Sequence, residues 1–156
     1  MKLNLLAIGN KMPGWVNEGY QEYAKRLPRE CQLNLLEIPA AKRGKSGNAV
    51  QWMEDEGDRL LALIPSNHHV VSLEVKGKPW STEQLARQMK QWLADGRNVS
   101  LLIGGPDGLS QKCSQRADQA WSLSSLTLPH PIVRIVLAEQ LYRAWMVLQN
   151  HPYHRA

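Results

Sequence analysis

Short apolar runs alternate along the chain with stretches in which apolar residues recur every three or four positions. The runs predict buried strands, and the wider spacing predicts amphipathic helices. Strands are expected at residues 2–9, 31–38, 68–75 and 98–103, with residues 121–128 as a short fifth strand or an extended loop. Helices are expected at residues 13–27, 48–64, 81–95, 110–119 and 132–149.

Local residues mark several element ends. Pro13 suits the first turn of a helix, and residues 76–80 predict a turn. Ser81 with Gln84 three residues later has the pattern of a capping box, and Gly96 occupies a helix stop position. These residues define the ends of the third helix more closely than the spacing of its apolar residues alone.

Strands that alternate with helices predict an α/β fold with a mainly parallel sheet covered on both faces. Ligands in such sheets bind at the carboxyl ends of the strands. The loops after Gly9, Ile38, Leu73, Ile103 and Leu123 are therefore the informative ones. No internal repeat or long linker divides the chain, so one domain over residues 1–156 is expected.

The composition narrows the class of protein. A chain that is 43% hydrophobic and 21% charged is not disordered, and apolar runs of four to six residues are too short to cross a membrane. The apolar N-terminal stretch stops at Gly9, unlike a secretory signal, so a cytoplasmic location is expected. Cys31 and Cys113 lack neighbours at ligand spacing, which favours free thiols and no metal site. A net charge of +5 modestly favours an anionic partner such as nucleic acid.

Three glycines follow the fourth expected strand, in the loop Gly104-Gly105-Pro106-Asp107-Gly108. Glycines at this position let a ligand approach the backbone closely. The loop does not match the dinucleotide-binding pattern. A tight turn before the next helix and a ligand site, formed by Gly104, Gly105 and Gly108, both remain open from the residues alone.

The loop at residues 39–46 ends in Gly44-Lys45-Ser46, like a phosphate-binding P-loop. Pro39 stands where that pattern requires glycine, which argues against a nucleotide triphosphatase. The better functional hypothesis is that this loop contacts nucleic-acid phosphates through Lys42, Arg43 and Lys45. A solvated basic loop is the alternative.

The C-terminal third combines apolar and reactive residues. Residues 123–128 mix apolar and hydroxyl side chains before Pro129-His130-Pro131, and they could line an apolar pocket or form a last strand. The final helix is apolar over too wide an arc for one stripe, which is consistent with burial against the sheet and a partner subunit. Glu139 and Arg143 have the spacing of an ordinary helix ion pair.

Five ordered motifs resemble the ribosomal RNA large subunit methyltransferase H family, the pseudouridine N3-methyltransferases of the SPOUT superfamily. They lie at residues 101–109, 121–124, 126–130, 138–145 and 151–155, and the resemblance extends to residues 1–3, 11–13, 38–40 and 42–45. It implies an α/β SPOUT fold with a deep C-terminal trefoil knot. It also implies a homodimer that uses S-adenosyl-L-methionine on a pseudouridine in helix 69 of 23S rRNA, in the assembled ribosome.

The resemblance places the cofactor pocket at residues near three strand ends. These residues are Leu73, Gly104, Leu123, Ser124, Ser125, Leu126, Thr127 and Leu128. Gly105 and Gly108 join them because they belong to the same glycine loop. A sulfonium methyl donor requires no metal, so donor and acceptor need only be held in line.

The tail supplies candidate chemistry, because an aromatic residue between histidines and an arginine suits an unstacked base. The N3 proton of the acceptor must leave, which calls for a base. We assign His154 as base or orienter, Tyr153 as stacking or hydrogen-bonding partner, and Arg143 beside them, with Arg143 and Arg155 contacting RNA. A nucleotide triphosphatase and a non-catalytic ribosome-binding factor are the competing classes.

Overall fold

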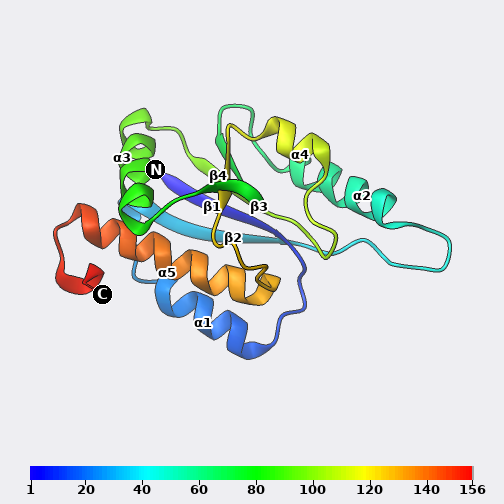
Figure 1. Ribbon diagram of the computed structural model, residues 1–156, viewed down its shortest axis with the longest axis horizontal. Coiled ribbons are helices and arrows are strands. Elements are labelled where there is room, and N and C mark those ends of the chain that lie inside the picture. Colours follow the sequence, from blue (N-terminus) through cyan, green and yellow to red (C-terminus); the bar gives the residue numbers. More distant parts are fainter. Residues whose placement is uncertain (156) are drawn as a thin grey trace.

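The structure is a computed structural model that describes residues 1–155, without the side chain of His154 (Figure 1). Five parallel strands form a sheet with the order β2-β1-β4-β3-β5. The strands are β1 (Lys2–Ile8), β2 (Gln32–Ile38), β3 (His69–Pro79), β4 (Val99–Ile103) and β5 (Gln119–Ser122). The parallel α/β fold expected from the sequence is confirmed.

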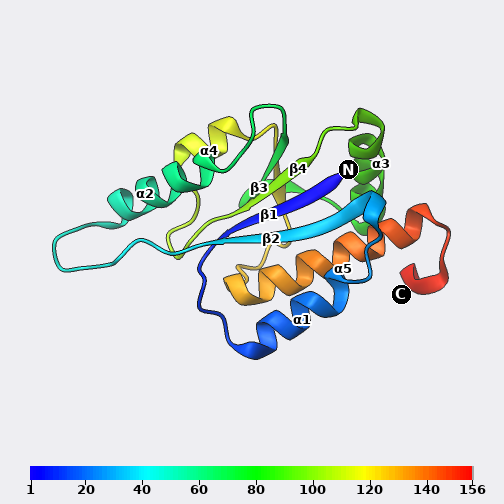
Figure 2. The same ribbon diagram turned by 180° about the vertical axis from the view of Figure 1, so that it is seen from behind.

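Helices cover both faces of the sheet (Figures 1 and 2). They are α1 (Gly14–Ala24), α2 (Ala49–Ala62), α3 (Thr82–Asp95), α4 (Gln111–Arg116) and α5 (His130–Leu148), with short 3-10 turns at Arg29–Cys31 and Pro152–His154. Helices α1, α3 and α5 lie on one face, and α2 and α4 lie on the other. Within the described residues, no helix has the length and hydropathy that a membrane crossing requires.

The alternation of side chains along β1 divides the core into two clusters. Leu3 and Leu5 point into the cluster with α1, α3 and α5, whereas Leu6 and Ile8 point into the cluster with α2 and α4. All four side chains are at most 3% exposed, and burying each contributes roughly 1.5–3 kcal/mol. A central strand must therefore be apolar on both sides, as the continuous run at this end of the sequence indicated.

Local signals set the helix ends as expected. The Ser81–Gln84 capping box is present, and Gly96 ends α3 in the left-handed conformation with φ of 82°. The Asn48 side chain caps α2 by accepting a hydrogen bond from the Gln51 N–H at 2.9 Å. Because these bonds lie within a few residues of one another, the sequence pattern alone could predict them.

The region around β3 and β5 differs from the sequence prediction. The helix expected to reach residue 119 ends at Arg116, and β5 begins at Gln119 and ends at Ser122, so residues 123–128 form a loop. Strand β3 continues to Pro79, through the expected turn at 76–80, and both Leu73 and Lys78 pair with Trp121. A Cβ on Gly77 would lie 2.7 Å from the backbone of Trp121, so only glycine permits this approach.

Arg134 is the largest of the side chains that are almost completely buried, with 1% exposed. It projects from α5 toward the ends of β1 and β2. Its Nη1 donates to Glu37 Oε2 at 2.6 Å, and its Nη2 donates to the Gly9 carbonyl at 2.6 Å. These charge-assisted bonds attach α5 to the sheet edge. Helix α5 also packs against α1 and α3, which accounts within one chain for much of its broad apolar surface.

Candidate active site

A cavity of about 600 Å³ opens at the carboxyl ends of β4 and β5 and beside residues 73–76 of β3, which follow the part of β3 that pairs with β4. We call it the strand-end cavity. Its walls are residues 73–76, 103–109, 121–124 and 126–128, with His130 and Val133 from the start of α5. This is the edge of a parallel sheet where ligands bind, and the volume is that of a small-molecule site.

The glycine loop forms one wall and is also a tight turn. The Gly108 N–H donates to the Gly105 carbonyl at 3.0 Å, and Gly108 has φ of 87°. A Cβ on Gly104 would lie 2.5 Å from the Gly108 carbonyl carbon, which is backbone and cannot swing aside. The two interpretations left open by the sequence are therefore compatible, since the turn itself lines the cavity.

The residues assigned to the cofactor by sequence gather on this cavity, with one exception. Leu73, the three glycines and the 123–128 loop all contribute to its walls, but Ser125 does not. Ser124 shapes the loop, because its hydroxyl accepts from the Leu126 N–H at 2.9 Å. Leu126, in the same turn, lines the cavity and is 72% exposed.

Sequence reasoning missed two polar residues in the cavity wall. Glu74 accepts hydrogen bonds from Ser72 Oγ at 2.6 Å and Ser114 Oγ at 2.8 Å. His130 is partly buried, and its Nδ1 has no hydrogen-bond partner in the described part of the chain. Burial lowers the pKa of His130, although the nearby Gly105 backbone acts in the opposite direction. The available signals were the position of Glu74 directly after Leu73, where the sequence indicated an informative loop, and that of His130 at the start of the last helix.

The second group of predicted site residues lies near the C-terminal end of α5. Arg143 Nε donates to Glu139 Oε1 at 2.8 Å, so the expected helix ion pair is present. Arg143 Nη1 also donates to the Tyr153 carbonyl at 3.4 Å, and the Tyr153 hydroxyl donates to Glu139 Oε1 at 3.3 Å. The Tyr153 ring lies edge-on to Tyr142 with centroids 4.7 Å apart. We call Glu139, Tyr142, Arg143 and Tyr153 the tail cluster.

Burial and the Glu139 carboxylate set the protonation states of Tyr153 and Arg143 in the tail cluster. Burial raises the pKa of Tyr153, and the Glu139 carboxylate adds to this effect, so the phenol stays protonated at neutral pH. The hydrogen bond to Glu139 raises the pKa of Arg143. Arg155 is exposed, whereas the His154 side chain lies outside the described part of the structure. The tail cluster therefore offers a neutral phenol and a fixed cation.

One chain does not bring the tail cluster to the strand-end cavity. Val133 lines the cavity and Arg143 belongs to the tail cluster, and ten helical residues separate them by about 15 Å along the axis. Figure 1 shows the C-terminal tail at the opposite end of α5 from the loop that connects β5 to this helix. The two predicted halves of the site are thus at different ends of one helix.

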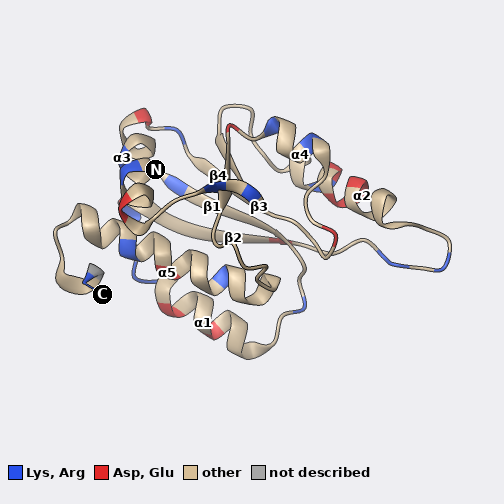
Figure 3. Cartoon of the chain, viewed as in Figure 1, with Lys and Arg blue, Asp and Glu red and all other residues tan. Residues whose placement is uncertain are grey.

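The basic loop between β2 and α2 projects from the molecule (Figure 3). Lys42 and Lys45 are exposed. Arg43 is 25% exposed, because its Nη1 donates to Glu56 at 2.7 Å and its Nη2 donates to Asp107 at 2.9 Å. Helix α2 begins at Ala49, three residues after Ser46, and Asn48 caps it. A P-loop requires its lysine and serine at the start of the following helix. The structure therefore does not support the hypothesis that this chain is a nucleotide triphosphatase.

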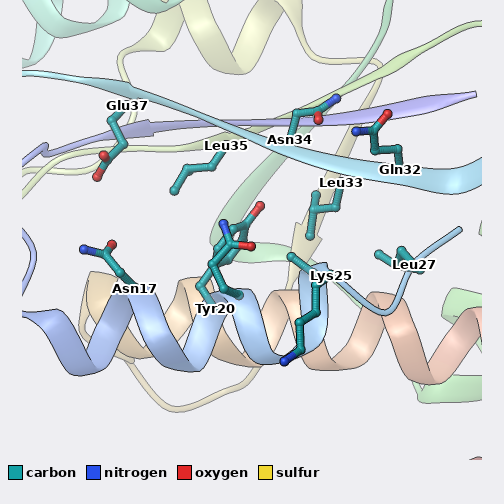
Figure 4. Close-up of a pocket in the computed structure, with 11 residues that line it drawn as sticks. Asn17, Tyr20, Lys25, Leu27, Gln32, Leu33, Asn34, Leu35 and Glu37 are labelled. Atoms are coloured by element: carbon teal, nitrogen blue, oxygen red, sulfur yellow. The ribbon is translucent and has the colours of Figure 1, made fainter. Parts of the chain in front are cut away.

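A second cavity, of about 660 Å³, lies between α1 and the edge strand β2 (Figure 4). We call it the α1 groove. Its walls are Asn17, Tyr20, Gln21, Ala24, Lys25 and Leu27, with residues 32–35 and Glu37 of β2. The groove contains none of the site residues predicted from the sequence. Its walls are mostly long polar side chains rather than strand ends.

Comparison with known proteins identifies the family of the chain. The family model described as "Predicted SPOUT methyltransferase" matches residues 1–154. The "Ribosomal RNA large subunit methyltransferase H" of Marinomonas sp. (strain MWYL1) is 60% identical over 155 residues, which is 99% of this chain and 100% of that protein. The protein of the same name from Methylococcus capsulatus (strain ATCC 33009 / NCIMB 11132 / Bath) is 57% identical with the same coverage. The chain therefore belongs to the SPOUT methyltransferase family.

Proposed function

We propose that this chain transfers a methyl group from S-adenosyl-L-methionine to N3 of a pseudouridine in helix 69 of 23S rRNA, within the assembled ribosome and in the cytoplasm. The observation that carries the proposal is the strand-end cavity, which gathers nearly all the residues that the resemblance assigns to the cofactor. The names of relatives that are 57% and 60% identical over their full length support the rRNA substrate. We take residues 1–156 as the single domain that performs it.

The walls of the strand-end cavity suit the cofactor. Leu73 and Leu123 offer apolar surface to a flat heterocycle, and the backbone at the strand ends offers donors and acceptors. Glu74 brings a carboxylate to the cavity wall, which complements a sulfonium or ammonium group. When bound, S-adenosyl-L-methionine supplies an activated methyl group. The residues of this chain then have to hold the acceptor in line and accept its proton.

The tail cluster supports the second half of the reaction. Its neutral Tyr153 can stack on the base or donate a hydrogen bond to it, and the raised pKa argues against Tyr153 as the proton acceptor. Arg143 places a fixed positive charge beside that ring, with its guanidinium 5.0 Å from the ring centre. We assign proton acceptance to His154 and RNA contact to Arg155 and Arg143. Lys42, Arg43 and Lys45 complete the proposed RNA surface.

A homodimer reconciles the separation of these two halves. In one chain, the tail cluster and the strand-end cavity lie at different ends of α5, about 15 Å apart by helical rise. A two-fold arrangement can place the tail of one subunit over the cavity of the other. Half-buried apolar residues on α5, such as Ile132 and Val136, are available to such a contact. We therefore propose that each active site uses both subunits.

One experiment tests the reaction as a whole. Ribosomes that lack the modification are incubated with the protein and labelled S-adenosyl-L-methionine, and the modified nucleoside is located by mass spectrometry. Label at N3 of a helix 69 pseudouridine is expected. Binding to ribosomes without methyl transfer would identify a non-catalytic factor, and calorimetric binding of ATP in place of the cofactor would identify a triphosphatase.

The base assignment has its own test. His154→Ala should lower the single-turnover rate on intact ribosomes by roughly 100-fold or more, because proton transfer contributes 10²–10⁴. His151→Ala is the matched control, since it removes the other tail histidine, whose Nδ1 only accepts from the Tyr153 N–H at 3.2 Å. A near-normal rate for His154→Ala would remove His154 from the mechanism.

A further inference from the structure

Arg43 does not point freely into solvent with its lysine neighbours. Its Nη1 donates to Glu56 Oε2 at 2.7 Å and to the Ala41 carbonyl at 2.8 Å, and its Nη2 donates to Asp107 Oδ2 at 2.9 Å. The guanidinium also lies over the Trp52 ring, 5.5 Å from its centre. These contacts join the basic loop and helix α2, which follow one another in the sequence, to the glycine loop, which is 64 residues from Arg43 at Asp107.

Glu56 is the buried centre of this arrangement, with 1% of its surface exposed. Its Oε2 accepts from Arg43 and from the Ala41 N–H at 2.9 Å, which compensates the burial of the charge. Its Oε1 has no hydrogen-bond partner among the described residues and faces the glycine loop. A Cβ on Gly105 would lie 2.6 Å from that oxygen, so the carboxylate presses directly against the loop backbone.

The glycine loop is buried at Gly104 and Gly105 but exposed beyond them. Pro106, Asp107 and Gly108 are exposed, and the Gly108 to Gly105 hydrogen bond is a single turn. Loops with several glycines sample many backbone conformations unless contacts restrict them. Arg43 and Glu56 restrict this one from outside the cavity, through Asp107 and through Gly105.

We propose that Arg43 and Glu56 form a latch that positions residues 104–108, the glycine wall of the strand-end cavity, for the cofactor. Arg43 is then a positioning residue of the cofactor site before it is an RNA contact, and the exposed Lys42 and Lys45 carry the phosphate contacts of this loop. The geometry requires arginine, because a lysine amine cannot bond to Glu56 and Asp107 with two separate arms. The inference rests on the proposal that this cavity holds S-adenosyl-L-methionine.

Arg43→Lys separates the two roles, because it keeps the charge and removes the fork. In calorimetry without RNA, Arg43→Lys and Asp107→Asn should each weaken cofactor binding roughly 5- to 20-fold, and the double variant should be little worse than either, because both break one link. The matched control is Lys45→Ala on the same loop, which should leave cofactor affinity within about twofold and lower the salt slope of ribosome binding. Unchanged cofactor affinity in Arg43→Lys would overturn the latch.

A second readout needs no cofactor. Hydrogen exchange of the free protein should show faster exchange at residues 104–108 in Arg43→Lys and Glu56→Gln, with the preceding strand β4 unchanged. Faster exchange spread evenly over the sheet would overturn the latch, because it would mean only a general loss of stability. If the wild-type protein binds no cofactor at all, the proposed function fails, whereas the exchange result still decides the latch.

Discussion

The strand-end cavity and the α1 groove have similar volumes, about 600 and 660 Å³, but different walls. The strand-end cavity is bounded by three neighbouring strands, two of which end there, and by glycine backbone that side chains cannot replace. The α1 groove is bounded by long side chains such as Gln21 and Lys25 on the surface of a helix. Volume therefore does not distinguish a site from a surface hollow, whereas the chemistry and stiffness of the walls do.

The difference follows from how each cavity is built. Parallel strands end together, so their terminal backbone groups and the loops after them converge on one point. Helix α1 instead packs mainly on α5 and makes few contacts with the edge strand β2. The gap that remains is lined by surface side chains of the helix and of β2. The four predictions below test whether function separates the two regions as clearly as structure does.

Removal of Arg134 should have the largest effect, because this residue stands between the two regions. It shares α5 with Val133 of the strand-end cavity, and its partner Glu37 belongs to the α1 groove. Arg134→Met should lower the free energy of unfolding by about 3 kcal/mol, at the low end for a broken buried pair because Glu37 is partly exposed. Denaturant unfolding measures this. Lys25→Met in the groove is the control, and an equal loss there would contradict the distinction.

Gly104→Ala tests the backbone wall of the strand-end cavity. Its new Cβ would lie 2.5 Å from the Gly108 backbone, so the loop must move. Affinity for S-adenosyl-L-methionine should fall by at least roughly 100-fold, or about 2.7 kcal/mol. Gly44→Ala is the matched control, since a Cβ there meets nothing within 4 Å. Cofactor affinity that stays within tenfold in Gly104→Ala would place the binding site elsewhere.

His130 gives the strand-end cavity a titratable group whose lowered pKa affects stability below neutral pH. Burial lowers its pKa below the ordinary 6.5, so the unfolded chain binds a proton before the folded one as pH falls. The free energy of unfolding should therefore decrease as pH falls below about 6.5, and His130→Gln should reduce that slope between roughly pH 7.5 and 5.5. A residual slope is expected from His68, whose pKa burial also lowers. Identical slopes in the two proteins would refute the assignment.

The α1 groove should give the smallest effect. The double variant Asn17→Ala/Gln21→Ala removes two amides from its wall. Cofactor affinity and methyl transfer to ribosomes should stay within about twofold of wild type, as for ordinary surface substitutions. A tenfold loss in either measurement would make the groove part of the functional surface.

Much of the fold could be predicted from the sequence because the signals are local. The apolar run of β1, the capping box at Ser81 and the stop at Gly96 each depend on a few neighbouring residues, and all are present. The predicted bounds of β5 were wrong because the position of this strand depends on a contact between residues that are far apart in the sequence. There the Gly77 backbone meets that of Trp121, and no local pattern encodes that contact.

The candidate site shows the same limit. From the residues, the sequence determined a parallel α/β fold and the glycine loop at a strand end, and through family motifs it identified a methyltransferase. Only the tertiary structure placed Glu74 and His130 in the cavity wall, left Ser125 outside it, and turned Arg43 toward Glu56 and Asp107. The reason is physical. Motifs record neighbours along the chain, whereas ion pairs such as Arg43–Asp107, 64 residues apart, form only once packing brings distant loops together.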